Sequence, residues 1–519
     1  MVTARSIYLA SWPKAFGRRA ALRDRGEGNV CAIAPPRSGK GIGVVIPTLL
    51  TWPESVVVMD IKGENFRLTA GRRNQLGSVV LKFDPTAEGS CCFNPFDEVP
   101  LRTADEWGEI DNIATSLLDP RGRGAAMDSH WDRQGVGWVG AAICHLLYVE
   151  PDKTLRGLAH LIAGLGQSER RGDGIIQTIK QMRDSNHTGQ GPHPDVAREM
   201  QMMLDKSPNE RSGIISTVQG FLKIYRDPRI AAATSRSDFR ISDLMNHQRP
   251  VSLYLVIPVK DMDRIQPLLR LVLNQIVKGL APRMEGTAAR WKLLLMLDEF
   301  CVLGHMELLS KMLPFIPGYG IRTCVIAQNL TQIEAAYGRD QPIVQTCETL
   351  LALTPNRDDI QTAEFLSKLA GDTTVVERHR SWSSSGPSTS EQKTRRPLIT
   401  PGEVLELPTT KALIFKRGAK PILADQFVYY RDATFRKWSQ LKPPAQSDRI
   451  HHGIEYAAIP AASPTCSEAA PERRAEVPYW REPNGHKEEK AAGAEDQAGQ
   501  LRNVSEVGSR EGVLDELLP

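Results

Sequence analysis

Residues 36–41 combine the residue types and spacing that bind phosphate. They follow the short apolar run 30–34 and match most of the G-x-x-x-x-G-K-[ST] pattern with Pro36, Arg37, Ser38, Gly39, Lys40 and Gly41. In such a loop, glycine lets backbone N–H groups turn toward the phosphate, lysine supplies a point charge, and the next helix points its N-terminus at the anion. We predict a phosphate-binding loop. The alternative is a lysine in a polar turn between a strand and a helix.

Three positions near this loop depart from the general pattern. Ala34 stands in place of the first glycine, and Gly41 stands in place of the Ser or Thr whose hydroxyl normally ligates Mg²⁺. Pro47 is expected to end or kink the following helix after about two turns. A lost hydroxyl weakens one Mg²⁺ contact but leaves the lysine in place.

Two adjacent acids, Asp298 and Glu299, close the apolar run 292–297. A buried strand would carry them to the carboxyl edge of a sheet, where ligands bind in open α/β folds. Asp298 is suited to hold Mg²⁺, directly or through water, and Glu299 is suited to polarise an attacking water as general base. The alternative is that the two acids cap a turn. Asp60, which ends the strand-like run 55–60, is a competing metal ligand and could lie near the nucleotide with Lys62 and Glu64, or cap a turn.

The predicted strand 322–327 carries two further candidates. Gln328 follows its end, where an amide could sense the γ-phosphate and couple hydrolysis to motion, or be an ordinary strand-end amide. Arg322 begins the strand at the opposite end. In a ring it could reach the phosphate of a neighbouring subunit as an arginine finger, although an ordinary surface arginine fits the sequence as well.

Strands and helices alternate on both sides of a helical block. Apolar runs predict strands at 30–34, 55–60, 78–83, 251–257, 292–297, 322–327 and 348–353, with helices near 265–280, 306–313, 331–337 and 359–370. Between them, helical spacing dominates at 107–118, 131–148, 155–165, 174–182, 196–204 and 211–225. These patterns predict an α/β fold with a mostly parallel sheet, formed by residues 30–103 and 246–440, and an all-α domain over 104–245.

The remaining segments are less regular in sequence. Residues 1–29 are expected to be an irregular lead-in, and 376–398, with six serines and five Lys or Arg residues, a mobile loop. Folded material should return at 399–436, with strands near 411–415 and 425–430. Residues 441–519 are expected to be a disordered acidic tail.

Charge and cysteine usage limit the function classes. The net charge of +4 does not by itself indicate a nucleic-acid partner, although residues 466–519 carry 12 acidic and 7 basic residues and leave the rest of the chain mildly basic. The eight cysteines form no C-x-x-C pair, which predicts reduced and mostly buried thiols. Histidine spacing gives no metal-ligand pattern. No run of 18 or more apolar residues predicts a membrane span.

Several phrases in this sequence resemble the TraG-like type IV secretion coupling proteins. They are the loop at 37–41, Val-Val-Val-Met-Asp-Ile-Lys-Gly-Glu-Asn at 56–65, Asn94-Pro95, Leu-Asp-Glu-Phe at 297–300, Ala-Gln-Asn-Leu-Thr-Gln at 327–332 with Tyr337-Gly338, and Thr-Ala-Glu-Phe-Leu-Ser at 362–367. The similarity covers about residues 25 to 435. Glycine after the loop lysine is usual in this branch.

The resemblance implies a RecA-like motor domain with an all-α domain that takes part in DNA or substrate recognition, and assembly as a homo-hexamer. It implies hydrolysis of ATP with Mg²⁺, and delivery of relaxase-bound single-stranded DNA, or of effector proteins, to a type IV secretion channel. It also implies a place at the cytoplasmic face of the bacterial inner membrane. Such proteins usually begin with two transmembrane helices, whereas here the phosphate loop arrives by residue 40. We therefore expect an anchorless form, a truncated start or an anchor supplied by another subunit.

Two other functions fit the same residues. One is a nucleotide-binding adaptor that docks substrates without hydrolysis, against which Glu299 argues because a decayed site would be free to lose it. The other is a cytoplasmic P-loop ATPase that acts on DNA without a secretion system.

Overall fold

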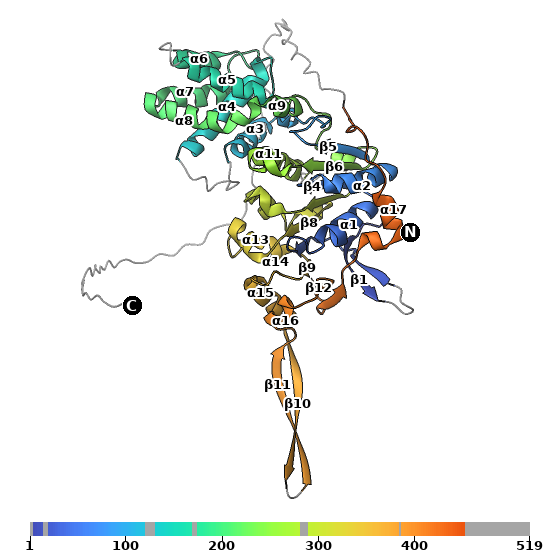
Figure 1. The fold of residues 1–519 in the computed structure, drawn as a ribbon. Coiled ribbons are helices and arrows are strands. Elements are labelled where there is room, and N and C mark those ends of the chain that lie inside the picture. Colours follow the sequence, from blue (N-terminus) through green and yellow to red (C-terminus); the bar gives the residue numbers. More distant parts are fainter. Residues whose placement is uncertain are drawn as a thin grey trace, which may run out of the picture. The chain divides into compact units, whose positions relative to one another are not determined.

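The fold is built on one large sheet (Figure 1). The computed structural model describes residues 4–13, 19–119, 130–168, 174–280, 289–383 and 386–451. The sheet has 11 strands in the order β2-β1-β13-β12-β9-β3-β8-β7-β4-β6-β5. The strands are β1 (Ile7–Pro13), β2 (Arg19–Asp24), β3 (Val30–Ile33), β4 (Ser55–Asp60), β5 (Val79–Phe83), β6 (Val251–Val256), β7 (Leu293–Leu297), β8 (Ile321–Ala327), β9 (Thr349–Leu353), β12 (Lys411–Lys416) and β13 (Ile422–Asp425).

The seven strands from β9 to β5 are parallel to one another. They coincide with the seven apolar runs of the sequence, because a parallel sheet covered on both faces needs side chains that can be buried on each side. Alternate residues of β3 show the two faces: Val30 and Ala32 belong to one apolar cluster, and Cys31 and Ile33 to another.

Helices cover both faces of the parallel sheet. The cluster around Val30 includes Leu49 of α1 and Ala70 of α2, and the cluster around Cys31 includes Leu269 of α11, Ile333 of α13 and Leu366 of α15. The helices of this α/β part are α1 (Ile46–Thr51), α2 (Glu64–Gln75), α11 (Met262–Gly279), α12 (Glu307–Met312), α13 (Leu330–Tyr337), α14 (Pro342–Thr346), α15 (Ile360–Ala370), α16 (Pro401–Leu405) and α17 (Ala433–Ser439). The chain therefore has the predicted α/β fold.

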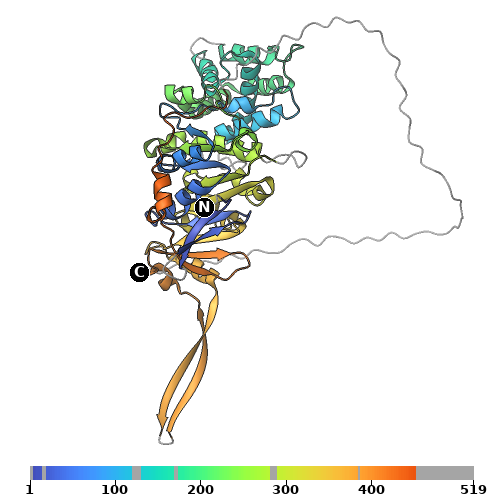
Figure 2. The ribbon, with the colours of Figure 1, turned by 90° about the vertical axis from the view of Figure 1, so that its right-hand side faces the viewer.

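An all-α domain is inserted between β5 and β6 (Figure 2). Its helices are α3 (Glu106–Leu118), α4 (His130–Val149), α5 (Leu155–Ser168), α6 (Gly174–Asp184), α7 (Pro194–Asp205), α8 (Pro208–Leu222), α9 (Pro228–Ala233) and α10 (Asp243–Asn246). Ile110 of α3 and Ile143 of α4 share one continuous core cluster with the sheet face that contains Cys31. Helical spacing in the sequence located all six of the longer helices.

The segment before the phosphate loop is not an irregular lead-in. Strands β1 and β2 pair antiparallel and join the sheet through Ser11 of β1, which lies opposite Asp425 of β13. Ile7 and Ala10 are fully buried. The sequence hid these strands because β2 contains Arg19 and Arg23 and buries mainly its last residue.

Where the sequence predicted a loop over 376–398, residues 372–383 and 386–397 form the two strands of a long hairpin (Figure 1). Strand β10 (Asp372–Ser383) pairs antiparallel with β11 (Gly386–Pro397) from the pair Asp372 and Pro397 onward. Both faces of the described hairpin are largely exposed, so polar composition does not oppose pairing, and opposite charges meet across the strands. Arg378 lies directly opposite Glu391, with a hydrogen bond of 2.8 Å between Nε and Oε1.

The C-terminal segment also differs from expectation. The strand expected at 425–430 ends instead at Asp425, because the chain turns there toward the phosphate loop. Residues after 441 continue along the sheet: Asp448 accepts a hydrogen bond from Val80 N and donates its own N–H to Val80 O, at 2.8 and 3.0 Å. The expected disorder is therefore wrong for 441–451, and residues 452–519 lie outside the described residues.

Candidate nucleotide-binding site

The phosphate loop turns sharply as it leaves β3. Ala34 N donates to Ala327 O of β8 at 2.8 Å, and the chain then passes through left-handed backbone at Arg37 (φ 62°) and Gly39 (φ 97°). A methyl group added at Gly39 would lie 2.5 Å from Gln426 Oε1. The backbone angle favours glycine at this position, and any larger residue would also have to displace the end of the Gln426 side chain.

The helix after the loop begins at Lys40 with a widened turn. Residues Gly41–Val45 form a π-helix, in which Ile46 N donates to Gly41 O, and α1 then continues to Thr51. Pro47 occupies the first turn of α1, where its missing N–H is tolerated. The sequence predicted an end or kink at Pro47; the structure places the irregularity one turn earlier.

Lys40 meets the two predicted acids. Its Nζ lies 3.3 Å from Asp298 Oδ1 and also forms an ion pair with Glu299 Oε1. All three side chains are mostly buried, with 14 to 18% of their surface exposed. Lys40 follows β3, and both acids follow β7, so the charges converge at the carboxyl ends of parallel strands as expected.

Glu299 is held in an unusual backbone conformation. Its φ of 59° and ψ of 42° place it in the left-handed region, which a non-glycine residue rarely adopts. Gln328 Nε2 donates to Glu299 Oε2 at 2.8 Å. Strand β8, which carries Gln328, lies between β3 and β7, so the amide necessarily lies between the loop and the acids. Such strain persists only where the surroundings fix the residue, and it is concentrated at functional sites.

Two buried carboxyls lie side by side at this edge. Burial raises the pKa of Asp298, Lys40 opposes the rise and Glu299 adds to it. Burial also raises the pKa of Asp60 to about 6. Hydrogen bonds from the backbone N–H groups of Phe66, Asn65 and Lys62 lower this pKa, and repulsion from Asp298 raises it further. Asp60 caps the start of α2, because its Oδ2 accepts a hydrogen bond from Phe66 N at 2.7 Å.

These residues fit a nucleotide with a divalent cation. Ser38 Oγ in the loop is buried and has no hydrogen-bond partner among the described residues, so it can donate a hydrogen bond to a phosphate oxygen. Apart from the Lys40 ion pair, Asp298 Oδ1 has no hydrogen-bond donor in that part of the chain. A buried carboxylate beside two other acids is best compensated by positive charge. Asp298 is accordingly the residue best placed to hold Mg²⁺.

Comparison with known proteins gives the family. The sequence matches the model for "Type IV secretory system Conjugative DNA transfer" over residues 7–458. The chain belongs to this family. It is thus a TraG-like type IV coupling protein.

Two relatives align with most of the length of this chain. Conjugal transfer protein TraG of Escherichia coli is 36% identical over 480 residues, which span 86% of this chain and 74% of that protein. Protein VirD4 of Agrobacterium fabrum is 28% identical over 453 residues, spanning 82% of this chain and 62% of that protein.

Solved structures share the fold. The conjugative coupling protein TrwBdeltaN70 superposes with a TM-score of 0.58 at 15% identity, covering 82% of this chain and 89% of that one. TrwB in complex with ADP and Mg²⁺ gives 0.56 at 16% identity, covering 77% and 85%. The coupling protein thus has a RecA-like P-loop fold. None of the helices in the described ranges combines the length and apolar character needed to cross a membrane.

Not every predicted residue reaches the site of the coupling protein. Arg322 lies at the opposite end of β8, is 4% exposed, and pairs through Nη2 with Asp24 Oδ1 at 3.2 Å. Its Nε donates to Gly28 O at 2.9 Å. A side chain held in this way cannot project to a neighbouring subunit, so we assign Arg322 a structural role. Lys62, Glu64, Pro36 and Arg37 are exposed.

Two residues at the site were missed from the sequence. Gln426, just after β13, donates through Nε2 to Ser38 O at 2.9 Å and so supports the loop from a segment 388 residues away. Asn65 is 5% exposed and hydrogen-bonds the carboxylate of Asp298. No motif marks Gln426, whereas Asn65 ends the phrase at 56–65 that carried the resemblance.

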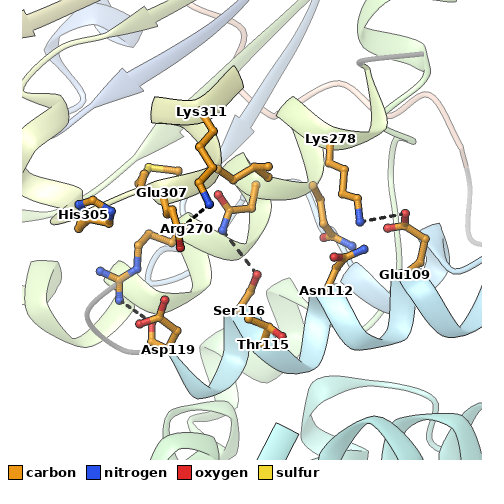
Figure 3. A pocket seen from close by; sticks show the side chains of 14 residues that line it. Glu109, Asn112, Thr115, Ser116, Asp119, Arg270, Lys278, His305, Glu307 and Lys311 are labelled. Carbon is orange, nitrogen blue, oxygen red and sulfur yellow. Dashed lines mark hydrogen bonds and ion pairs between the residues drawn. The ribbon is translucent and has the colours of Figure 1, made fainter. Parts of the chain in front are cut away.

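A hollow lies beside the all-α domain (Figure 3). It has a volume of about 240 Å³ and lies between α3, α11 and the segment 305–311. Lys278 of α11 and Glu109 of α3 point toward one another across it, with Nζ and Oε1 3.5 Å apart. Arg270 Nη1 donates to Leu303 O at 2.7 Å, on the short helix that begins directly after Glu299. Arg270 of α11 is thus bonded to the end of the short helix that follows Glu299.

Proposed function

We propose that this coupling protein hydrolyses ATP to deliver relaxase-bound single-stranded DNA, or protein substrates, to a type IV secretion channel. The observation that carries the proposal is the meeting of Lys40, Glu299 and Gln328 at the carboxyl ends of three strands. An adaptor that only binds nucleotide has no need for a general base held in strained backbone beside the phosphate loop.

Each side chain has a distinct part in the hydrolysis. Lys40 neutralises phosphate charge from the loop, and the loop N–H groups orient the phosphates. Glu299 accepts a proton from the attacking water, and Gln328 holds the Glu299 carboxylate in place. Asp298 would hold Mg²⁺, which supplies further neutralisation of phosphate charge when bound.

The glycine at position 41 is compatible with this mechanism. Phosphoryl transfer depends mainly on positioning and electrostatic stabilisation, and Lys40, Asp298 and Glu299 provide both. A side chain at Gly41 would meet no other atom within 4 Å, so room remains there for a water to complete the coordination of the cation.

Transport requires that hydrolysis change the shape of a substrate-contacting part. Arg270 donates to Leu303 O and to Asp119 O, and so joins the segment after Glu299 to the residue that follows α3 of the all-α domain. We assign the all-α domain to substrate contact, and a homo-hexamer at the cytoplasmic face of the inner membrane as the working assembly, in keeping with the family.

The test is ATP turnover by the purified full chain, with and without single-stranded DNA. Lys40→Ala and Glu299→Gln should each abolish DNA-stimulated turnover, with Glu299→Gln retaining nucleotide binding. Glu364→Gln, which changes an exposed carboxylate on α15, is the matched control and should leave turnover unchanged. Nucleotide binding without turnover by the assembled wild-type chain would refute the motor and favour the adaptor.

A further inference from the structure

The all-α domain contains a cluster of metal-ligand side chains that the nucleotide chemistry does not use. Glu106 at the start of α3, Cys144 in α4 and His193 just before α7 bring one carboxylate oxygen, one thiol sulfur and one ring nitrogen within 4.8 Å of one another. Glu106 is 4% exposed and Cys144 is fully buried. Three elements far apart in sequence thus converge on one point.

Two of the three distances between the ligand atoms are close to those around a zinc ion. Zinc bonds of about 2.0 to 2.3 Å place neighbouring ligand atoms of a tetrahedral site roughly 3.3 to 3.6 Å apart. Glu106 Oε1 lies 3.4 Å from His193 Nε2 and 3.9 Å from Cys144 Sγ. The third distance, between the thiol and the ring, is at most 4.8 Å, so side-chain movements of roughly 1 Å bring the three atoms to the spacing of the ion.

The two oxygens of Glu106 have different surroundings. Oε2 accepts hydrogen bonds from Tyr148 OH, at 2.7 Å, and from Arg102 N. Oε1 faces the thiol and the ring, and within the described ranges of the chain its contacts are these two longer ones. Oε2 is thus fixed by two hydrogen bonds, whereas Oε1 is available to bind a cation, which attracts a carboxylate more strongly than the thiol of Cys144 does.

A carboxylate beside His193 and a hollow next to the cluster would support metal binding. His193 Nδ1 lies 3.8 Å from Asp195 Oδ2, so a ring that binds metal through Nε2 can direct its remaining proton toward a carboxylate. A hollow of about 400 Å³ is lined by Glu106, Trp107, Tyr148 and His193. It gives an ion access from solvent and leaves room for water as a fourth ligand.

We propose that Glu106, Cys144 and His193 bind one zinc-like divalent ion that fastens α3, α4 and the start of α7 together. Binding replaces the thiol proton of Cys144, which passes to solvent. The ring of His193 keeps its one proton but carries it on Nδ1 instead of Nε2, and so gives up the hydrogen bond from Asp195 N. Thiolate and carboxylate balance the charge of the ion. The ion would stabilise the domain assigned above to substrate contact, at a place separate from the nucleotide residues.

The test begins with metal analysis of the tag-free full chain by mass spectrometry. We expect about one zinc per chain, and loss of it in Cys144→Ser. Cys92→Ser is the matched control, because Cys92 is also a buried cysteine and its Sγ donates to Ala232 O, outside the cluster of Glu106, Cys144 and His193. Equal zinc content in Cys144→Ser and Cys92→Ser would overturn the proposal, as would a wild-type chain that neither carries zinc nor takes it up.

A second variant guards against misfolding. His193 caps α7 by accepting from Asp195 N at 3.3 Å, and His193→Asn keeps a capping side chain while it removes the Nε2 ligand. We expect His193→Asn to lose zinc while its helix content, measured by circular dichroism, is kept. In the wild-type chain loaded with Co²⁺, a sulfur-to-cobalt charge-transfer band that Cys144→Ser lacks would support the site. Absence of this band in a cobalt-loaded wild type would refute it.

Discussion

Gln328 Nε2 and Glu299 Oε2 are joined by a 2.8 Å hydrogen bond between the ends of two adjacent parallel strands. The bond fixes one oxygen of a carboxylate whose other oxygen pairs with Lys40. If Glu299 is the general base, its orientation depends on this amide.

Replacing Gln328 with alanine should therefore slow hydrolysis without preventing nucleotide binding. We expect a fall of roughly 100-fold in kcat for ATP, the size seen when one fixed polar contact is removed from a reacting centre. Binding of a fluorescent ATP analogue should be unchanged. Gln361→Ala, at an exposed amide of α15, serves as control, and equal kcat values for the two variants would exclude the orienting role.

Two glycines of the phosphate loop should respond in opposite ways to substitution. Gly39→Ala places a methyl group against Gln426 Oε1 in left-handed backbone, so we expect a loss of roughly 1–3 kcal/mol in stability. Gly41→Ser meets no neighbour within 4 Å and should fold normally. It should also lower the Mg²⁺ concentration required for half-maximal turnover. Denaturant unfolding and Mg²⁺ titration check the two expectations, and destabilisation by Gly41→Ser would contradict the geometry.

The buried ion pair between Asp24 and Arg322 should make the stability of the folded chain depend on pH in the acid range. Burial alone would raise the pKa of Asp24, but hydrogen bonds from Thr349 and Gly26 and the charges of Arg322 and Lys416 hold it below its ordinary value. The stabilisation is therefore fully present above the ordinary aspartate pKa of about 4 and is lost as pH falls through the lower pKa of the folded state.

Asp24→Asn should remove that acid dependence and leave the Arg322 charge without its partner. We expect a loss of roughly 3–5 kcal/mol at neutral pH, the usual result of breaking a buried pair. Unfolding curves measured between pH 3 and pH 7, roughly the range of carboxyl titration, compare the free energy of unfolding of the wild-type chain with that of Asp24→Asn. Asp425→Asn, at a more exposed carboxylate of β13, should have a smaller effect.

The hairpin β10–β11 should be removable without loss of the core. Val375 lies opposite Thr394, and an Asn-Gly turn between them would replace the residues from 376 to 393. Trp382 is 81% exposed, and the described part of the hairpin beyond Val375 carries only exposed or half-exposed side chains. We expect the melting temperature to stay within experimental error; a marked drop would show that the hairpin supports the sheet.

The parallel sheet and its chemistry could be predicted because their signals are local. Buried strands such as 55–60 and 293–297 are continuous apolar runs, and the residues that follow them must gather at one edge. The meeting of Lys40 with Asp298 and Glu299 follows from this rule, and the structure confirms it. The described cysteines are free and most of them are buried, whereas their reduced state stays a prediction.

Features that depend on distant partners were not predictable. The polar strands of the hairpin are stabilised by each other rather than by a core, so composition indicated a loop. Arg322 looked available as a finger because Asp24, its partner, lies 298 residues earlier. Gln426 and the cluster of Glu106, Cys144 and His193 likewise come together only through the fold.

The segment that follows α17 has a consequence for solubility. Val80 and Lys82 belong to β5, the last strand of the sheet, and their N–H groups are taken up by Asp448 and by Ser447 Oγ. An uncovered outer strand can pair with that of another molecule and so start aggregation. A chain shortened to end at Leu441 would expose these N–H groups. Residues 442–451 thus cover the outer edge of β5 and keep neighbouring copies of the chain from adding their own strands to the sheet.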